Sequence, residues 1–209
     1  GPRIVRALVP VKASGSGKSR LAPALSEAER STLTRCMAED VLGALRDCQA
    51  IESVVILGSG EPAASLARET GCRLLPDDAS GDLCANLDRA AALLAGEGTA
   101  TLLIVPADLP GLAAADLDTL LRAHDAGVTL AAAGRDGGTN ALVLRPPQAI
   151  ACQFGPDSAA RHLAAGRAAG VPATRLSLQA FARDLDTVDD VRWFCRHAHR
   201  GATFDYLQR

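Results

Sequence analysis

The feature of this chain that most narrows its choice of fold is the alternation of short apolar runs with longer amphipathic segments. The apolar runs have the length of buried strands and fall at 4–11, 53–57, 73–75, 101–105, 128–132, 140–144 and 174–178. Helical patterns lie at 26–47, 62–69, 83–94, 114–124 and 157–168. A capping box at Ser26 opens the first of them, and Thr187 with Asp190 forms the capping box of an expected last helix. This alternation predicts an α/β fold, in which helices cover both faces of a mostly parallel sheet.

The length of 209 residues suits one well-buried α/β domain, whereas two domains would each be small. The sequence contains no internal repeat and no linker-like stretch, so we expect a single domain over residues 1–209. The chain starts with Gly1-Pro2 rather than Met, which is typical of the remnant of a cleaved tag.

Charge and composition argue against several classes of function. Lys and Arg number 22 against 24 Asp and Glu, a net charge of −2, so no general nucleic-acid surface is expected. No apolar run approaches the roughly 18 residues of a membrane span, and no signal peptide is visible. The six cysteines are scattered without a CxxC pair, which favours reduced thiols in a cytoplasmic protein.

The loop after the first apolar run is rich in glycine, serine and cations. Its segment 17–19 reads Gly-Lys-Ser, like the end of a P-loop, but Lys12 stands where that motif needs glycine. Pro23 would also break the helix that should follow. We therefore interpret the loop as a glycine-rich turn whose N–H groups cradle phosphates, with Lys12, Lys18 and Arg20 as added cations. A merely solvated basic loop is the alternative.

Three aspartates are candidates for a metal site. Asp108 lies three residues after the end of the apolar run 101–105. Asp184 and Asp186 lie two residues apart, so the side chains of these two point the same way in extended backbone. Such carboxylates are suitable ligands for Mg²⁺. Each has a simpler explanation, since Asp108 could cap a turn and Asp186 could merely precede the capped helix. Their combination favours the metal, because clustered carboxylates need a cation to offset their repulsion.

Small and hydroxyl-bearing residues form a fourth candidate. Gly137-Gly138-Thr139-Asn140 leads into an apolar run, and Phe154-Gly155-Pro156-Asp157-Ser158 begins a helix whose N-terminus could bind an anion. Ordinary turn chemistry explains the same segments equally well. His162 lies one helical turn beyond Ser158, and it is either part of the same pocket or a structural histidine.

Together these segments carry a family resemblance. VPVK…KSRLAP, the DLP after a strand, GGTNAL, FGPDSAARH and the late LDT resemble the 2-phospho-L-lactate guanylyltransferase family, over about residues 4–191. Its enzymes act in biosynthesis of the deazaflavin coenzyme F-420. The resemblance implies a Rossmann-like three-layer nucleotidyltransferase fold with a mostly parallel mixed sheet, related to that of the molybdenum-cofactor nucleotidyltransferases.

The resemblance also implies substrates and roles. GTP and a small phosphorylated acid (2-phospho-L-lactate, phosphoenolpyruvate or 3-phospho-D-glycerate) would be the substrates, and a homodimer is an open alternative to a monomer. The residues implied are Asp108, Asp184 and Asp186 for Mg²⁺, Lys12, Thr139, Gly155 and Ser158 for the acceptor, and Lys18 and Arg20 for the nucleotide phosphates. Catalysis by Lys12, Lys18 and Arg20 would consist of positioning and charge neutralisation, because an ionised acceptor phosphate needs no general base.

Departures from related patterns leave other functions open. Cys84 stands where relatives often carry Asn, an exchange that removes an amide and opens space if this position faces the substrate. A nucleotidyltransferase for molybdopterin or a sugar phosphate would carry a G-G-x-x-x-R-type loop after the first strand. This chain has Val11-Lys12 there, which argues against that function. A non-catalytic domain that binds phosphorylated acids and regulates a partner is the alternative of a different class.

Overall fold

A single sheet organises the protein. The computed structural model describes residues 3–13 and 18–209, and over these residues it has one seven-stranded sheet in the order β3-β2-β1-β4-β6-β5-β7. The strands are β1 Val5–Pro10, β2 Ser53–Leu57, β3 Arg73–Leu75, β4 Thr101–Ile104, β5 Gly127–Ala132, β6 Thr139–Arg145 and β7 Ala173–Leu176. Strand β6 runs antiparallel to β4 and β5, and the other pairings are parallel. The predicted mostly parallel, mixed sheet is confirmed.

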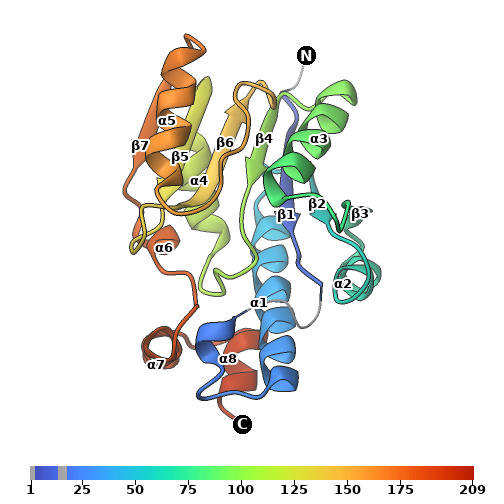
Figure 1. The fold of residues 1–209 in the computed structure, drawn as a ribbon, viewed down its shortest axis with the longest axis vertical. Helices are drawn as coiled ribbons and strands as arrows, with labels where there is room; N and C mark the ends of the chain where they lie inside the picture. Colours follow the sequence, from blue (N-terminus) through green and yellow to red (C-terminus); the bar gives the residue numbers. More distant parts are fainter. Residues whose placement is uncertain (1–2, 14–17) are drawn as a thin grey trace.

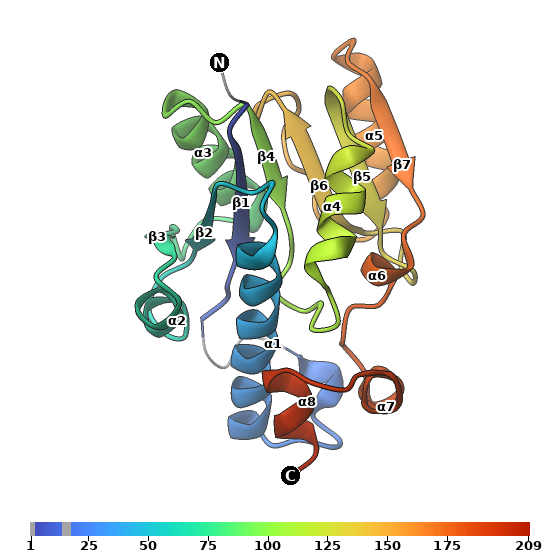
Figure 2. The same ribbon diagram turned by 180° about the vertical axis from the view of Figure 1, so that it is seen from behind.

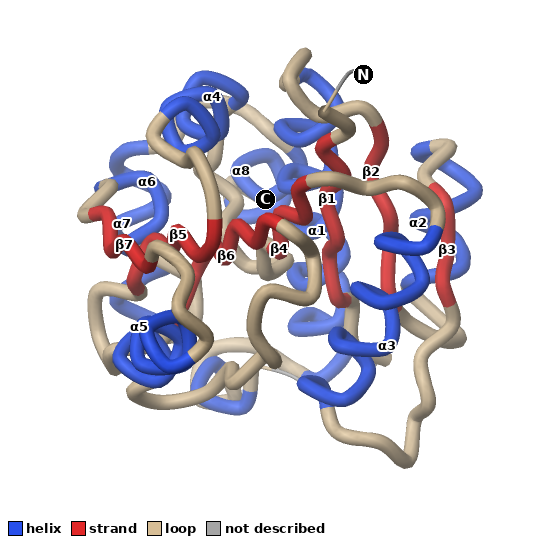
Figure 3. The backbone as a smooth tube through the Cα atoms, turned by 90° about the horizontal axis from the view of Figure 1, so that it is seen from above, coloured by secondary structure: helices blue, strands red, loops and turns tan. Residues whose placement is uncertain are grey.

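Helices lie on both faces of this sheet and complete the three layers (Figures 1 and 2). Their bounds are α1 Glu27–Asp47, α2 Ala63–Thr70, α3 Leu83–Gly96, α4 Ala114–Arg122, α5 Ser158–Ala168, α6 Gln179–Ala182, α7 Val188–His197 and α8 Ala202–Leu207, with a 3-10 helix, η1, at Ser19–Leu21. Helices α1, α2, α4 and α6 pack on one face, and α3 and α5 on the other (Figure 3). None of the helices described is long and apolar enough to cross a bilayer.

The continuous apolar runs of the sequence follow from this arrangement. Successive side chains of a strand point to opposite faces, so in β1 Ala7 and Val9 pack towards α1 while Leu8 packs towards α3. All three are fully buried. A strand buried on both faces needs apolar residues at every position rather than at every second one.

A smaller apolar cluster extends the fold beyond the sheet. It joins η1, α1 and α7 through Leu21, Leu33, Met37, Leu185 and Phe194, and partly buried residues of α8, among them Phe204, pack against it. Figures 1 and 2 show α8 beside the start of α1, at the end of the molecule where the chain terminates.

The local sequence predicted most helix starts but missed some elements. The capping boxes at Ser26 and Thr187 are present as predicted. The helix that follows Thr187 is not the last one, because α8 begins five residues after α7 ends. The two carboxylate oxygens of Asp40 accept the N–H groups of Ala202 and Thr203, each at 2.9 Å, and so cap α8 from a distant part of the chain. Helices α6 and η1, which were also not expected, are less than two turns long.

The topology brings the candidate segments to one edge of the sheet. Strands β1 and β4 are parallel neighbours, so the loops after them leave the same edge. Strand β6 runs the opposite way, so its first residue, Thr139, reaches that edge instead of its last. This is the carboxyl edge, where α/β sheets bind their ligands.

Candidate functional site

A cleft of about 450 Å³ opens at the carboxyl edge. The loops after β1 and β4, the start of α1 and the segment before α7 all contribute to its wall. Its polar lining includes Lys12, Lys18, Arg30, Thr34, Asp108, Asp136, Asp184 and Asp186, together with the backbone of Gly155. The structure therefore brings together six of the nine residues predicted for the site, among them all three aspartates. Residues 14–17, for which a glycine-rich turn was predicted, lie outside the described residues.

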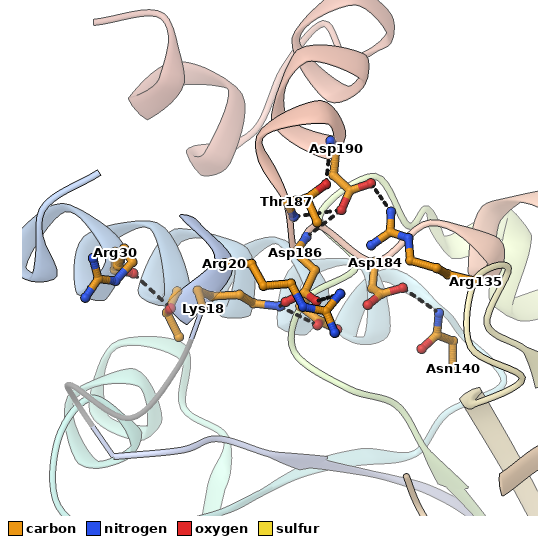
Figure 4. A network of polar contacts seen from close by, with 11 residues as sticks. Lys18, Arg20, Arg30, Arg135, Asn140, Asp184, Asp186, Thr187 and Asp190 are labelled. Carbon is orange, nitrogen blue, oxygen red and sulfur yellow. Dashed lines mark hydrogen bonds and ion pairs between the residues drawn. The ribbon is translucent and has the colours of Figure 1, made fainter. Parts of the chain in front are cut away.

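The side chain of Lys18 lies between Asp108 and Asp186, and Figure 4 shows it beside Asp186. Its Nζ is 2.7 Å from Oδ2 of Asp108 and 3.3 Å from Oδ1 of Asp186. Burial acts to lower the pKa of Lys18, but attraction to Asp108 and then to Asp186 outweighs it, so the pKa is raised. Arg20 holds the other oxygen of Asp186, with Nη1 at 3.1 Å from Oδ2. Asp186 is thus neutralised by two cations.

Asp108 and Asp184 are less well compensated. Oδ1 of Asp108 is buried and has no hydrogen-bond partner among the residues described. Burial raises the pKa of Asp184, and the negative charge of Asp108 raises it further. Asn140 partly offsets this, since its Nδ2 donates to Oδ1 of Asp184 at 3.4 Å and to the carbonyl of Phe181 at 2.7 Å. A bound cation would stabilise this arrangement, because it would pair with the free oxygen of Asp108 and offset the repulsion between the two carboxylates.

The fit of these residues to Mg²⁺ follows from that environment. Within the described ranges, no three His, Cys, Asp or Glu side chains form a ready-made metal cluster, and the ammonium group of Lys18 lies between Asp108 and Asp186. Mg²⁺ does not require such a cluster, since it is commonly held by one or two carboxylates together with substrate phosphates. Asp108 and Asp184 fit that kind of site, with the free Oδ1 of Asp108 as the available ligand atom.

A further carboxylate, Asp190, fixes the segment that carries Asp186. Its Oδ2 accepts the N–H groups of Asp186 at 2.9 Å and Thr187 at 2.8 Å, and Arg135 pairs with its Oδ1 (Figure 4). Burial acts to raise the pKa of Asp190, but Arg135 and the backbone donors lower it to about 2. The sequence identified Asp190 only as a helix cap and gave Arg135 no role. The pairing of Arg135 with Asp190 could not be found there, because it joins the β5–β6 turn to α7.

The hydroxyl groups predicted for the acceptor lie behind the cleft rather than in it. Oγ1 of Thr139 is 2.9 Å from Oγ of Ser158 and 2.9 Å from Nδ1 of His162. Nε2 of His162 accepts the N–H of Gln153 at 2.8 Å, so Nδ1 carries the proton and donates to Thr139. Ser158 and His162 are fully buried, and burial, aided by the charge of Arg161, lowers the pKa of His162 to about 4. Of the two interpretations of His162, the structure supports the structural one.

The start of α5 is also largely satisfied from within the protein. The N–H of Ser158 donates to the carbonyl of Gly155 at 3.1 Å, and that of Ala159 donates to Gly137 at 3.0 Å. Two of the donors that a helix N-terminus offers to an anion are therefore occupied. Gly155 lines the cleft in a backbone conformation, φ +134°, that side chains rarely adopt. Thr139, Ser158 and His162 hold this glycine loop in place.

Cys84 is close to the same loop. Its Sγ lies 3.9 Å from the carbonyl oxygen of Phe154, and burial raises its thiol pKa. The preceding residue, Leu83, lines the cleft and is 41% exposed. Cys84 is thus beside the cleft wall.

Similarity to known proteins agrees with this geometry. Residues 5–209 match the family described as Guanylyl transferase CofC like. A phosphoenolpyruvate guanylyltransferase from Sphaerobacter thermophilus is 39% identical over 95% of this chain and 96% of its own. A 3-phospho-D-glycerate guanylyltransferase from Phenylobacterium zucineum is 35% identical over 90% and 88%. A 2-phospho-L-lactate guanylyltransferase from Methanothermobacter thermautotrophicus is 31% identical over 97% and 89%.

Solved structures support the same fold at low sequence identity. A nucleotidyl transferase from Methanothermobacter has a TM-score of 0.68 at 15% identity, covering 94% of this chain and 98% of its own. A 4-diphosphocytidyl-2C-methyl-D-erythritol synthase has a TM-score of 0.64 at 16% identity, covering 92% and 97%. The predicted nucleotidyltransferase fold is confirmed by these likenesses.

Proposed function

Since the chain belongs to the family of CofC-like guanylyl transferases, we propose that it transfers GMP from GTP to a small phosphorylated carboxylic acid. The relatives described above are named for phosphoenolpyruvate, 3-phospho-D-glycerate and 2-phospho-L-lactate. These acids share a phosphate and a carboxylate on a three-carbon frame, so the proposed acceptor is one of them. A role in coenzyme F-420 biosynthesis is proposed with it, from the family resemblance.

The observation that carries the proposal is the arrangement of charge in the cleft. Lys18 and Arg20 lie beside Asp186, and Lys12 lines the same cleft. A triphosphate and a phosphorylated acid together carry many negative charges, and such a reaction is accelerated chiefly by positioned opposite charge. The cations of this cleft supply that charge next to the free carboxylate oxygen of Asp108.

The proposed reaction needs no nucleophile from the protein. An oxygen of the acceptor phosphate attacks the α-phosphorus of GTP, a new P–O–P linkage forms, and the bond between the α-phosphorus and the bridging oxygen breaks as pyrophosphate leaves. Lys18 and Arg20 would bind the nucleotide phosphates, and Lys12 with the Gly155 loop would orient the acceptor. Thr139 and Ser158 would act from behind by fixing that loop.

Mg²⁺ is proposed as the cofactor. Asp108 and Asp184 would hold it, with Asp186 beside them, and when bound it would neutralise charge on the phosphates. Asn140 orients Asp184, and Asp190 orients the backbone of Asp186. The protein thus supplies ligands whose positions are fixed before the substrates arrive.

Pyrophosphate release tests the proposed function. It would be measured for GTP, ATP, CTP and UTP, each paired with the three acids and with Mg²⁺ present. We expect GTP to be preferred and one acid to give the highest kcat/KM. Equal rates with GTP and ATP would contradict the guanine preference, and no release with any of the acids would contradict the proposed acceptor class.

A further inference from the structure

The inference concerns what neutralises the carboxylates before any substrate binds. The Lys18 side chain is only 12% exposed and contacts both Asp108 and Asp186, whereas Arg20 is 61% exposed and contacts only Asp186. The ammonium group of Lys18 is therefore the inner cation of the site and the guanidinium of Arg20 is the outer one.

The charges of the described side chains do not balance. Asp108, Asp184 and Asp186 contribute three negative charges when ionised, and Lys18 and Arg20 oppose two of them. Arg135 pairs with Asp190 and not with these three aspartates. The remaining charge is next to Asp184 and the unpaired Oδ1 of Asp108. A divalent cation that entered alone would be attracted less strongly than by three unpaired carboxylates, because two of the charges are already paired. The nearby ammonium group of Lys18 would also repel it.

Lys18 can change partners more easily than the carboxylates can. Its ammonium is on a flexible four-carbon stem, while Asp186 and Asp184 are in a segment fixed by Asp190 and Asn140. Lys18 lines the cleft, so phosphates in that cleft would compete for its ammonium. Movement of Nζ onto a phosphate would free Oδ2 of Asp108 and Oδ1 of Asp186 at the same time.

We propose that Lys18 is the resident counter-ion of the metal site, and that nucleotide phosphates must draw it away before a divalent cation binds tightly. Nucleotide and metal then bind with positive coupling, each raising the affinity for the other. Without nucleotide, the protein would bind divalent cations only weakly, and the metal would enter with the triphosphate. This inference rests on the proposed function, because it assumes that a nucleotide triphosphate occupies this cleft.

Binding of Mn²⁺, followed by electron paramagnetic resonance without any turnover, tests the inference. The intact protein would be titrated with Mn²⁺ alone and again with a non-hydrolysable GTP analogue present. For the wild type we expect weak binding alone and tighter binding with the analogue, by the roughly 5- to 150-fold that is typical of coupled sites.

Substitutions separate the counter-ion from general charge effects. Lys18→Gln should bind Mn²⁺ alone at least about tenfold tighter than the wild type does and should lose most of the coupling, an expected change within the usual range. Lys18→Arg keeps the charge and should resemble the wild type. Lys12→Gln removes a cation from the same cleft without a described contact to Asp108 or Asp186, and should stay within roughly threefold of the wild type.

The outcomes distinguish this inference from the function beneath it. Coupled Mn²⁺ binding in the wild type, with Lys18→Gln no tighter than Lys12→Gln, would overturn the counter-ion role and leave the proposed function standing. No Mn²⁺ binding by any variant, even with the analogue, would overturn both. Far-ultraviolet circular dichroism verifies that Lys18→Gln is folded. If Lys18→Gln does not fold, Lys18→Arg decides the question. Strong Mn²⁺ binding by Lys18→Arg without the analogue would contradict the proposal.

Discussion

The backbone N–H of Leu185 donates to the carbonyl oxygen of Asp108 at 2.9 Å, and this hydrogen bond joins the loop after β4 to the segment before α7. Leu185 itself is buried in the smaller apolar cluster. Asp184 and Asp186 flank it on either side and both line the cleft. The spacing of the three aspartates therefore depends on a backbone contact and a buried leucine.

Asp108→Asn should reduce turnover by roughly 100-fold or more, as is typical when one preorganised electrostatic contact of a reaction centre is lost. The substitution keeps the size of the side chain but removes the charge that pairs with Lys18. Pyrophosphate release at saturating Mg²⁺ measures the effect. The temperature of thermal unfolding should remain close to that of the wild type, because the lost repulsion between Asp108 and Asp184 offsets the lost pairing with Lys18. Near-normal activity would contradict the assigned role of Asp108.

Lys12→Ala should raise the KM for the acid more than the KM for GTP. A hydrogen bond to a charged group is worth about 1.5–3 kcal/mol, so a loss of roughly 10- to 150-fold is expected for the acceptor. Steady-state kinetics with each substrate varied in turn would measure it. A raised KM for GTP with an unchanged KM for the acid would show that the acceptor lies elsewhere in the cleft.

Ser158→Ala should act mainly on stability. Its hydroxyl is fully buried and 2.9 Å from that of Thr139, so its loss leaves a buried partner short of one hydrogen bond, at a cost of about 1–3 kcal/mol. Urea unfolding would show this cost, and the change in acceptor KM should be smaller than for Lys12→Ala. Unchanged stability with a large rise in acceptor KM would mean that the hydroxyl reaches the substrate.

His162 should make stability depend on pH in the mildly acidic range. Its pKa is lowered from 6.5 to about 4 in the folded protein, so the unfolded chain takes up the proton first as the pH falls. Stability is fully present above about pH 6.5 and declines as the pH falls towards about 4. The loss is about 3 kcal/mol, because each unit of pKa shift corresponds to about 1.4 kcal/mol. Urea unfolding of wild type and His162→Gln across this range should give a steeper slope for the wild type. Parallel slopes would contradict the assignment.

Asp40→Ala should destabilise the end of the fold without impairing chemistry. It removes the acceptor for two N–H groups at the start of α8, and such a cap is worth about 0.5–2 kcal/mol. Hydrogen exchange should rise over residues 202–207, while kcat/KM at low temperature stays near that of the wild type. Unaltered exchange there would show that packing alone holds α8.

The sheet could be predicted from sequence because its central strands are buried on both faces. Their apolar runs need no knowledge of the partner strand, and β2 has the predicted bounds. Strand β7 was predicted one residue late and too long, since its partly or fully exposed residues lack a clear apolar pattern. Helix α8 was missed because its cap, Asp40, belongs to α1.

The candidate site was predictable in its residue types and less so in its pairings. Aspartates and lysines that follow apolar strands are visible locally, and six of the nine predicted residues line the cleft. The sequence did not reveal that Lys18 lies between Asp108 and Asp186, because 90 and 168 positions separate those partners from it. The hydroxyl of Ser158 was expected to face the cleft, but its orientation is set by Thr139.

The reversed direction of β6 has a consequence for how such a site can diversify. Because β5 ends and β6 begins at the carboxyl edge, residues 133–138 form a hairpin turn there rather than a crossover through a helix. This turn carries Arg135, which pairs with Asp190, and Asp136, which lines the cleft. Turns of this kind accept insertions and deletions without moving the elements that they join. One wall of the cleft can therefore be remodelled in evolution or in the laboratory while β1 and β4, which precede Lys12 and Asp108, keep their register.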